Sequence, residues 1–228
     1  MLDMMATLLA ALPRALNLGV DAMSFDATAF HRVGNAVGVN PLALLVVVLA
    51  GLSQAVGQGV VLLLNRVPKP RFALSLVLMG AIYVAAATVT AVTTMIAADF
   101  AFASNVAFWP TIGVVALAHA PRLLGVFTLA PYFGDGLNRL LDIWVFVLVP
   151  YGLHYGLALP VAAALLSALI GWLSTRILWL LFGQPLTRLI TFLRHFIAGG
   201  ALPIDRQNLV EFLKAKAKEA VEMRGPGK

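Results

Sequence analysis

Two of the four histidines lie in strongly apolar parts of the chain, where an imidazole ring can serve as a ligand. His119 and His154 each fall within a run that is apolar enough to enter a membrane. There a neutral ring nitrogen can ligate haem or a chlorophyll-type pigment. The alternative is a structural role, because polar side chains inside membranes often bond to neighbouring helices. His119 and His154 are therefore candidate cofactor ligands, while the chain as a whole is predicted to hold no cofactor.

One arginine also lies at membrane depth. Arg122 directly follows Pro121 in an apolar segment, and a charge there costs about 2.5–3.5 kcal/mol on insertion scales unless it is paired or reaches water. The nearest acidic residues that follow are Asp135 and Asp142. We expect one of them, preferably Asp142, to neutralise Arg122. The pair is a structural contact that docks two helices, a buried switch or a substrate contact. Buried polar groups often fix helix register, which favours the structural contact.

Two glutamines share one face of the first predicted membrane helix. Gln54 and Gln58 are four residues apart, so they either form interhelical hydrogen bonds or line a polar path. A small-molecule transporter would bring both to a water-accessible pocket together with Thr90 and Arg122. We favour interhelical hydrogen bonds and treat Gln54, Gln58, Arg122 and Asp142 as structural buried polar residues.

The residue types needed for most enzyme chemistry are missing from the sequence. The chain has no cysteine, which excludes disulfides, thiolate catalysis and cysteine-based metal centres. It also lacks metal-binding histidine motifs, a Gly-x-Ser-x-Gly nucleophile motif and a phosphate-binding loop. We expect no catalytic residues, no metal site and no enzymatic activity.

The elements that position these residues are membrane helices. Of the 228 residues, 61% are hydrophobic and 11% are charged, with a mean hydropathy of +0.93, values far outside those of soluble domains. Several uncharged runs exceed the roughly 20 residues that cross a bilayer as helix, and only helices or closed barrels satisfy their own backbone in lipid. The predicted fold is an all-α polytopic membrane protein, a five-helix transmembrane bundle with amphipathic helices at both ends.

The predicted membrane domain comprises residues 39–182. Its spans are expected at residues 41–64, 72–98, 108–130, 137–155 and 159–181. The third span has two possible positions, Phe102 to Pro121 or Phe108 to Ala130, and Trp109-Pro110 as an interfacial start favours the second. The very short turn after Tyr155 makes the last two spans antiparallel neighbours, with alanines and Gly171 at their contact.

Both ends of the chain are predicted to form amphipathic helices. In the N-terminal region, 1–38, Leu2 to Leu18 should lie along the membrane surface, and a short helix should follow with Phe30, Val33 and Val37 on its apolar face. In the C-terminal region, 183–228, Gly183 and Pro185 are expected to end the last span. The residues predicted to contact the membrane surface are Arg188 and Arg194 on a flat helix over Leu186 to Ile197, and Lys214, Lys216 and Lys218 on a last helix.

The distribution of positive charge predicts an orientation. Two of the 16 lysines and arginines precede Asn65, three lie between Arg66 and Arg71, and nine follow from Arg176 onward. Positive charge favours the cytoplasmic side of a membrane. The Arg66 to Arg71 loop and the C-terminus are therefore expected in the cytoplasm, and the chain is expected to cross the cell membrane several times. Because the cations flank apolar segments, we expect anionic lipid as their partner and no nucleic acid.

Several short motifs occur in the order typical of one membrane family. They are Asp26, Phe30 and Arg32 before the first span, Ala120-Pro121 followed by Leu123 and Leu124, then Trp144, and Ile170-Gly171-Trp172. Over roughly Ser24 to Leu181 the chain resembles the Yip-one domain (Ypt-interacting protein) family in its prokaryotic form. The resemblance implies a five-span bundle without enzymatic chemistry. Eukaryotic members act in vesicle trafficking by contacting small GTPases and each other.

The expected function is that of a non-enzymatic integral membrane protein that organises membrane or a membrane protein complex. Its expected partners are the lipid bilayer and other membrane proteins or further copies of itself. Two alternatives belong to other classes. One is an accessory, cofactor- or pigment-binding subunit of a respiratory or photosynthetic complex, and the other is a small-molecule transporter.

Overall fold

The computed structural model describes residues 2–64, 69–102, 104–129 and 133–198, and these residues form helices without any strand. The predicted all-α class is therefore confirmed for the described part of the chain. In order, the helices are α1 (Leu2–Met23), α2 (Ala27–Gly34), α3 (Pro41–Leu64), α4 (Lys69–Phe102), α5 (Phe108–Ala118), the 3₁₀ helix η1 (Ala120–Leu129), α6 (Gly134–Leu157) and α7 (Val161–Ala198).

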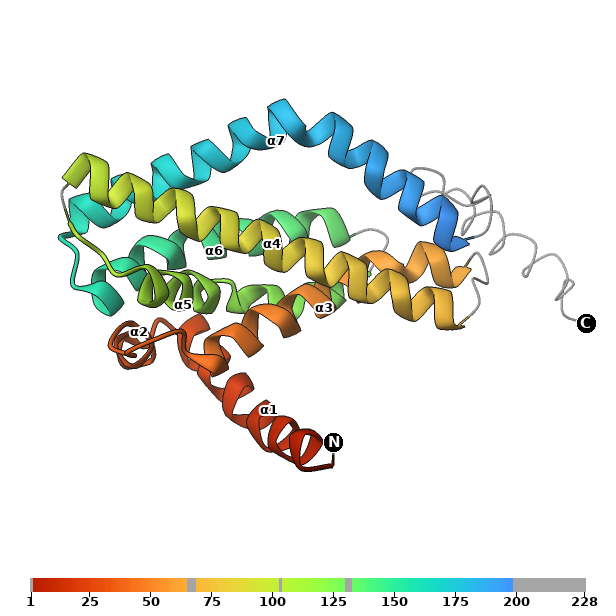
Figure 1. Cartoon of the computed structure of the whole chain (residues 1–228), viewed down its shortest axis with the longest axis horizontal. Coiled ribbons are helices and arrows are strands. Elements are labelled where there is room, and N and C mark those ends of the chain that lie inside the picture. Colours follow the sequence, from red (N-terminus) through yellow and green to blue (C-terminus); the bar gives the residue numbers. More distant parts are fainter. Residues whose placement is uncertain (1, 65–68, 103, 130–132, 199–228) are drawn as a thin grey trace, which may run out of the picture.

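The long helices run back and forth along one axis of the molecule. Figure 1 shows α3, α4, the α5–η1 segment and α6 along this axis, α7 arching over them, and α1 leaving the bundle at an angle. The ends of α4 and α6 and the starts of α5 and α7 lie at one end of this axis, near α2, and the ends of α3 and η1 and the starts of α4 and α6 lie toward the other. We call these the α2 end and the α6-start end.

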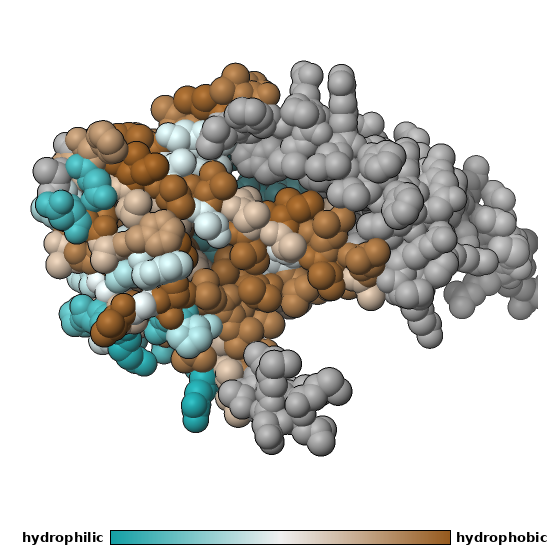
Figure 2. All heavy atoms as spheres, in the orientation of Figure 1, coloured by the Kyte–Doolittle hydropathy of each residue, from teal (hydrophilic) through white to brown (hydrophobic). Residues whose placement is uncertain are grey.

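Three segments of the described chain are long and apolar enough to cross a membrane. They are Phe72–Phe100, Phe108–Leu129 and Gly134–Leu157. Two shorter apolar helical stretches, Pro41–Gly57 and Val161–Ile177, belong to α3 and α7. The outer surface fits a lipid environment, because large apolar side chains on α6 and α7 are exposed, and Figure 2 shows apolar atoms over much of the visible surface.

Side-chain caps set the starts of α2 and α3. The Asp26 carboxylate accepts a hydrogen bond from the Thr28 amide at 2.8 Å, which satisfies one of the first unpaired N–H groups of α2. Asn40 does the same for α3 by accepting from the Leu42 amide at 3.0 Å. The helix predicted near Ser24 to Val33 is thus present, with Phe30 and Val33 fully buried. Val37 was wrongly placed on its apolar face, since α2 ends at Gly34 and Val37 is fully exposed.

The third predicted span, 108–130, is one segment but two kinds of helix. The α-helical part ends at Ala118, His119 follows as its C-cap, and the next ten residues form η1. Pro121 explains the change, because it has no N–H to donate and its ring clashes with the carbonyl of an α-helical turn. The Arg122 amide instead bonds to the His119 carbonyl three residues back, at 3.0 Å. This pattern tightens the backbone into 3₁₀ geometry.

The prediction that the last span ends at Gly183 and Pro185 was wrong. α7 continues as one helix of 38 residues through both positions, so residues 186–197 are its continuation and not a separate helix lying flat. At 1.5 Å per residue α7 measures about 57 Å, well beyond a hydrocarbon core of roughly 30 Å. Apolar sequence on both sides of Pro185 continues the helix, and proline is tolerated in membrane helices where neighbouring groups satisfy the freed carbonyl.

Other boundaries shift by a few residues. α4 is longer at both ends than the predicted 72–98, and α6 extends beyond 137–155 because Gly134-Asp135-Gly136 forms its first turn. α1 reaches Met23 instead of Leu18, and Ala15, Leu18 and Ala22 are buried against the bundle. The second half of α1 thus packs on protein rather than lying free along a surface.

Small residues allow the closest helix contacts. A Cβ atom at Gly34 would lie 1.8 Å from the Gly156 carbonyl oxygen, so α2 and α6 touch through their backbones. Gly171 was expected at the contact between the last two spans, but it faces α4, where a Cβ would lie 2.2 Å from Thr94 Oγ1. The small-residue face of α7 therefore packs mainly on α4. The reason is that the turn to α6 fixes proximity but not the rotation of α7 about its axis.

Candidate functional site

Arg122 is the centre of a polar cluster inside the bundle. It is the third residue of η1 and only 7% exposed. Its guanidinium forms an ion pair with Asp142 of α6 and donates hydrogen bonds to Asn138 Oδ1 and, at 3.1 Å, to Gln54 Oε1 of α3. We call Gln54, Arg122, Asn138 and Asp142 the arginine cluster. It links α3, η1 and α6.

The neutral members of the arginine cluster also bond to each other. Gln54 Nε2 donates to Asn138 Oδ1 at 3.1 Å, so Gln54 forms the interhelical hydrogen bonds expected of it. Asn138 and Asp142 are four residues apart and therefore lie on one face of α6. Asn138 was not identified from the sequence. The available signal was its position one helical turn before the expected carboxylate.

The electrostatics of the arginine cluster follow from unequal burial. Arg122 is buried, whereas the Asp142 side chain is 49% exposed. About half of the Asp142 side chain therefore stays exposed while its carboxylate neutralises the arginine. Asp135, the alternative partner, is exposed in the first turn of α6, whereas the ion pair of Arg122 is with Asp142.

A second polar contact supports the backbone of η1. Ser53 Oγ donates to the Leu123 carbonyl at 2.7 Å and accepts from the Val126 amide at 2.8 Å. A 3₁₀ helix of this length is uncommon, and its internal hydrogen bonds have poor geometry. The Ser53 hydroxyl therefore supplies hydrogen-bond partners to backbone groups that the helix itself satisfies only weakly. Gly57 and Gly125 make the approach possible, since a Cβ at Gly57 would lie 2.3 Å from the Gly125 oxygen.

His119 lies at the junction of α5 and η1 with a fixed ring orientation. Its Nδ1 lies 2.7 Å from the Val115 carbonyl oxygen, which can only accept, so Nδ1 is the donor. In the neutral ring Nε2 then carries a lone pair. The side chain is 8% exposed, and Tyr83 packs against its ring with centroids 5.9 Å apart. A backbone carbonyl on one ring nitrogen is also how ligand histidines are commonly oriented.

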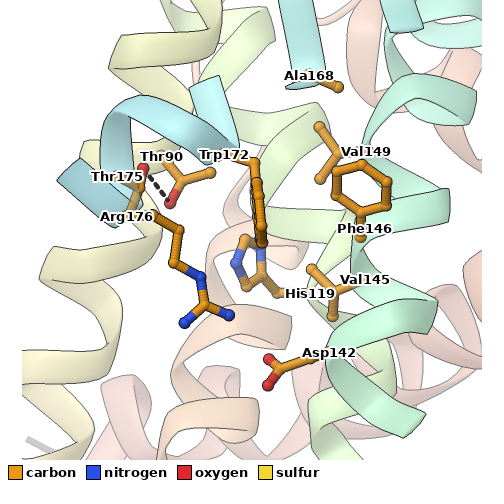
Figure 3. Close-up of a pocket in the computed structure, with 10 residues that line it drawn as sticks. All are labelled: Thr90, His119, Asp142, Val145, Phe146, Val149, Ala168, Trp172, Thr175 and Arg176. Atoms are coloured by element: carbon orange, nitrogen blue, oxygen red, sulfur yellow. Dashed lines mark hydrogen bonds between the residues drawn. The ribbon is translucent and has the colours of Figure 1, made fainter. Parts of the chain in front are cut away.

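A cavity of about 240 Å³ lies beside His119 and the arginine cluster. Figure 3 shows its lining, which comes from α4, the α5–η1 junction, α6 and α7: Thr90, His119, Asp142, Val145, Phe146, Val149, Ala168, Trp172, Thr175 and Arg176. The Arg176 guanidinium carbon lies 5.1 Å from the centre of the Trp172 ring. The transporter alternative placed Thr90 with Gln54, Gln58 and Arg122 on one pocket. Thr90 does line the cavity, but Gln54 and Arg122 do not. The charged and imidazole side chains in the lining are His119, Asp142 and Arg176.

His154 lies in a different environment. Its Nδ1 bonds to the Leu159 carbonyl at 2.6 Å, beside the left-handed turn at Ala158 that ends α6. This contact closes the turn between α6 and α7. The structure thus does not bring the two candidate cofactor ligands to one site, and no group of three or more metal-ligating side chains occurs in the described part of the chain.

The remaining predicted residues fall where side chains are not described. Gln58 belongs to α3, and Arg188 and Arg194 belong to α7, but their side chains lie outside the described set. Lys214, Lys216 and Lys218 lie outside the described residues altogether.

Comparison of the chain with family models, curated proteins and solved structures gives no match. The described geometry and the sequence are therefore the basis for the function proposed below.

Proposed function

We propose that this chain is a non-enzymatic, five-span protein of a cell membrane that organises membrane or a membrane protein complex, as its resemblance to the Yip-one domain family implies. The observation that carries the proposal is the arginine cluster. Arg122, the charge at membrane depth, is engaged in contacts among α3, η1 and α6. Such contacts fix how the helices dock, which suits a structural role.

The helix arrangement supports five crossings. α3 and α7 contribute apolar stretches in addition to the three long apolar segments, and consecutive helices run in opposite directions (Figure 1). The start of α4, with Lys69 and Arg71, and the far end of α7, with Arg188 and Arg194, lie at the α6-start end. The positive-inside rule then assigns this end, and the C-terminus, to the cytoplasm.

The proposal is tested by cross-linking in the intact membrane, followed by purification of the full-length tagged chain in mild detergent. We expect specific membrane proteins, or a second copy of this chain, to be recovered with it. A control purification would use a tagged, unrelated multi-pass protein of the same membrane. Recovery of the same set of proteins with both baits would contradict an organising role.

His119 favours one second candidate, an accessory subunit that binds haem or a pigment. The bond from Nδ1 to Val115 leaves the opposite nitrogen available as a ligand in the neutral ring. A visible absorption spectrum of the protein purified from its own membrane tests this function. A haem or chlorophyll band that is lost in His119→Ala but kept in His154→Ala would support it, and a featureless visible spectrum would reject it.

A further inference from the structure

The cavity beside the arginine cluster carries a net positive charge. Asp142 lines the cavity, and its charge is neutralised by Arg122, which pairs with it from outside the lining. Arg176 also lines the cavity as an exposed residue, and no carboxylate of the described residues forms an ion pair with it; its guanidinium lies over the Trp172 ring. A guanidinium in an apolar protein surface requires an anion or water as compensation. Arginine is well suited to phosphate and carboxylate groups because its planar donors match two oxygens at once.

The polar groups of the cavity include both donors and acceptors. Thr90 and Thr175 lie with their hydroxyl oxygens 3.4 Å apart beside Arg176, as Figure 3 shows. Across the cavity, Asp142 offers carboxylate oxygens and His119 offers the lone pair of Nε2. A ligand that fits this pattern has an anionic group for Arg176 and hydroxyl groups that donate to Asp142 and His119.

By helix length, the cavity lies nearer to the membrane boundary at which α6 starts than to the opposite boundary. Arg176 lies 15 residues after the first residue of α7, about 22 Å along the helix, which is roughly 8 Å short of the far side of a 30 Å hydrocarbon core that begins there. An arginine side chain reaches across such a distance toward the interface. Asp142 lies about 12 Å along α6 from its start, which is at this same side of the core.

The shape and walls of the cavity also favour an amphiphile. Its volume of about 240 Å³ is below the roughly 300–1,000 Å³ of sites that enclose drug-sized ligands, so it suits one small headgroup. Phe146 and Trp172, which also line it, are 37% and 40% exposed, and α6 and α7 continue outward with exposed apolar side chains such as Ile143 and Leu173. An acyl chain attached to the headgroup would lie along this surface.

We propose that the cavity binds the headgroup of an anionic phospholipid that carries both a phosphate and hydroxyl groups, with phosphatidylglycerol as the simplest example. Arg176 binds the phosphate, and Asp142 and His119 accept hydrogen bonds from the headgroup hydroxyls. Basic pockets between membrane helices are a recurring way to hold such headgroups. The proposal goes beyond the organising function and does not depend on which protein partner the chain has.

The test measures lipid binding to the full-length protein by native mass spectrometry in detergent. Three lipids are compared: phosphatidylglycerol, the anionic but hydroxyl-free phosphatidylmethanol, and zwitterionic phosphatidylcholine. We expect the wild type to bind them in that order. Arg176→Gln should lower phosphatidylglycerol binding by about ten-fold, the effect of losing one charge-assisted hydrogen bond.

Arg139→Gln is the matched control, because Arg139 is an exposed arginine of α6 that does not line the cavity. It should leave the binding unchanged. An equal loss in both variants, or no loss in Arg176→Gln, would overturn the site. Equal binding of phosphatidylglycerol and phosphatidylmethanol would overturn the hydroxyl contacts. Displacement of bound lipid by an equal concentration of soluble glycerol phosphate would overturn the lipid as the source of the phosphate.

Discussion

Arg122 carries its charge into the interior of the bundle, and the residues around it are arranged to compensate for that charge. The guanidinium contacts an oxygen of Gln54, Asn138 and Asp142. Removal of the arginine would leave the carboxylate without its counter-charge and two amides without one of their partners. Unpaired buried groups cost more free energy than the pair itself contributes, so single and double substitutions at this site should differ strongly.

We predict that Arg122→Leu lowers the free energy of unfolding and that Arg122→Leu with Asp142→Leu recovers much of the loss. Breaking a buried pair costs roughly 3–5 kcal/mol, and the low end applies because half of the Asp142 side chain is exposed. Thermal melting in detergent of both single variants and the double variant measures the coupling. Arg139→Leu is the control, since Arg139 is exposed. Simple additivity of the two single effects would show that the ion pair contributes no coupling energy.

Asp26 precedes the first predicted span, and its carboxyl leads to a prediction about how stability depends on pH. Hydrogen bonds from the Thr28 hydroxyl and amide lower the pKa of this carboxyl below its ordinary value. A carboxyl whose pKa is lower in the folded state stabilises the fold above its unfolded pKa, and this contribution is lost as the pH falls through the folded value. Asp26→Asn keeps a capping side chain but removes the titration. We therefore expect the wild type to lose more thermal stability than Asp26→Asn between pH 6 and about pH 3.

That comparison is made by melting both proteins in the same detergent over this pH range. Parallel loss of stability in the two proteins would mean that the Asp26 cap is not the titrating contribution.

Among the elements, η1 depends most on its neighbours, because a 3₁₀ helix of ten residues gains little from its own hydrogen bonds. It is held against α3 by Ser53 and by the absence of side chains at Gly57 and Gly125. The position of Arg122 follows from this packing. A change that moves η1 away from α3 should disturb the arginine cluster without touching any of its members.

We predict that Gly57→Ala destabilises the protein and Gly136→Ala does not. The added methyl at position 57 would lie 2.3 Å from the Gly125 oxygen, whereas at position 136 nothing lies within 4 Å. Alanine in an open helical position stabilises by about 0.4–1 kcal/mol, so the two substitutions should change the melting temperature in opposite directions. A rise or no change for Gly57→Ala would show that α3 and η1 are not in such close contact.

For the whole molecule, the alternating helices predict which loops share a side of the membrane. Val37 lies between α2 and α3, Ala158 directly follows α6 and Phe133 directly precedes it, and all three are exposed. The absence of native cysteine makes single-cysteine variants at these positions unambiguous. On intact cells, a membrane-impermeant maleimide should label Val37→Cys and Ala158→Cys, and should label Phe133→Cys only after permeabilisation. The opposite pattern would reverse the orientation, and labelling of all three from one side would contradict alternating crossings.

The sequence by itself predicted the helical class, which the structure confirms for the described residues, and the presence of apolar segments long enough to cross a membrane. Long uncharged runs leave helices as the way to satisfy backbone groups in lipid, and caps and prolines mark starts such as Asp26 and Pro41. The need for a carboxylate beside Arg122 followed from the cost of an isolated charge. These conclusions depend on local composition, on the cost of unsatisfied backbone groups and on the cost of an isolated charge. None of the three depends on which helix the segment packs against.

Only the tertiary structure decided which groups meet. Asn138 joins the arginine cluster, Gly171 faces α4 rather than α6, and Arg176 shares a cavity with His119, although none of these pairings is visible along the chain. Hydropathy also failed to show that η1 is a 3₁₀ helix and that α7 continues through Pro185. The physical reason is that the hydropathy of a uniformly apolar helix does not indicate which of its faces contacts a neighbouring helix. Contacts made by neighbouring helices, through small residues and buried hydrogen bonds, select one rotation and one end point for each.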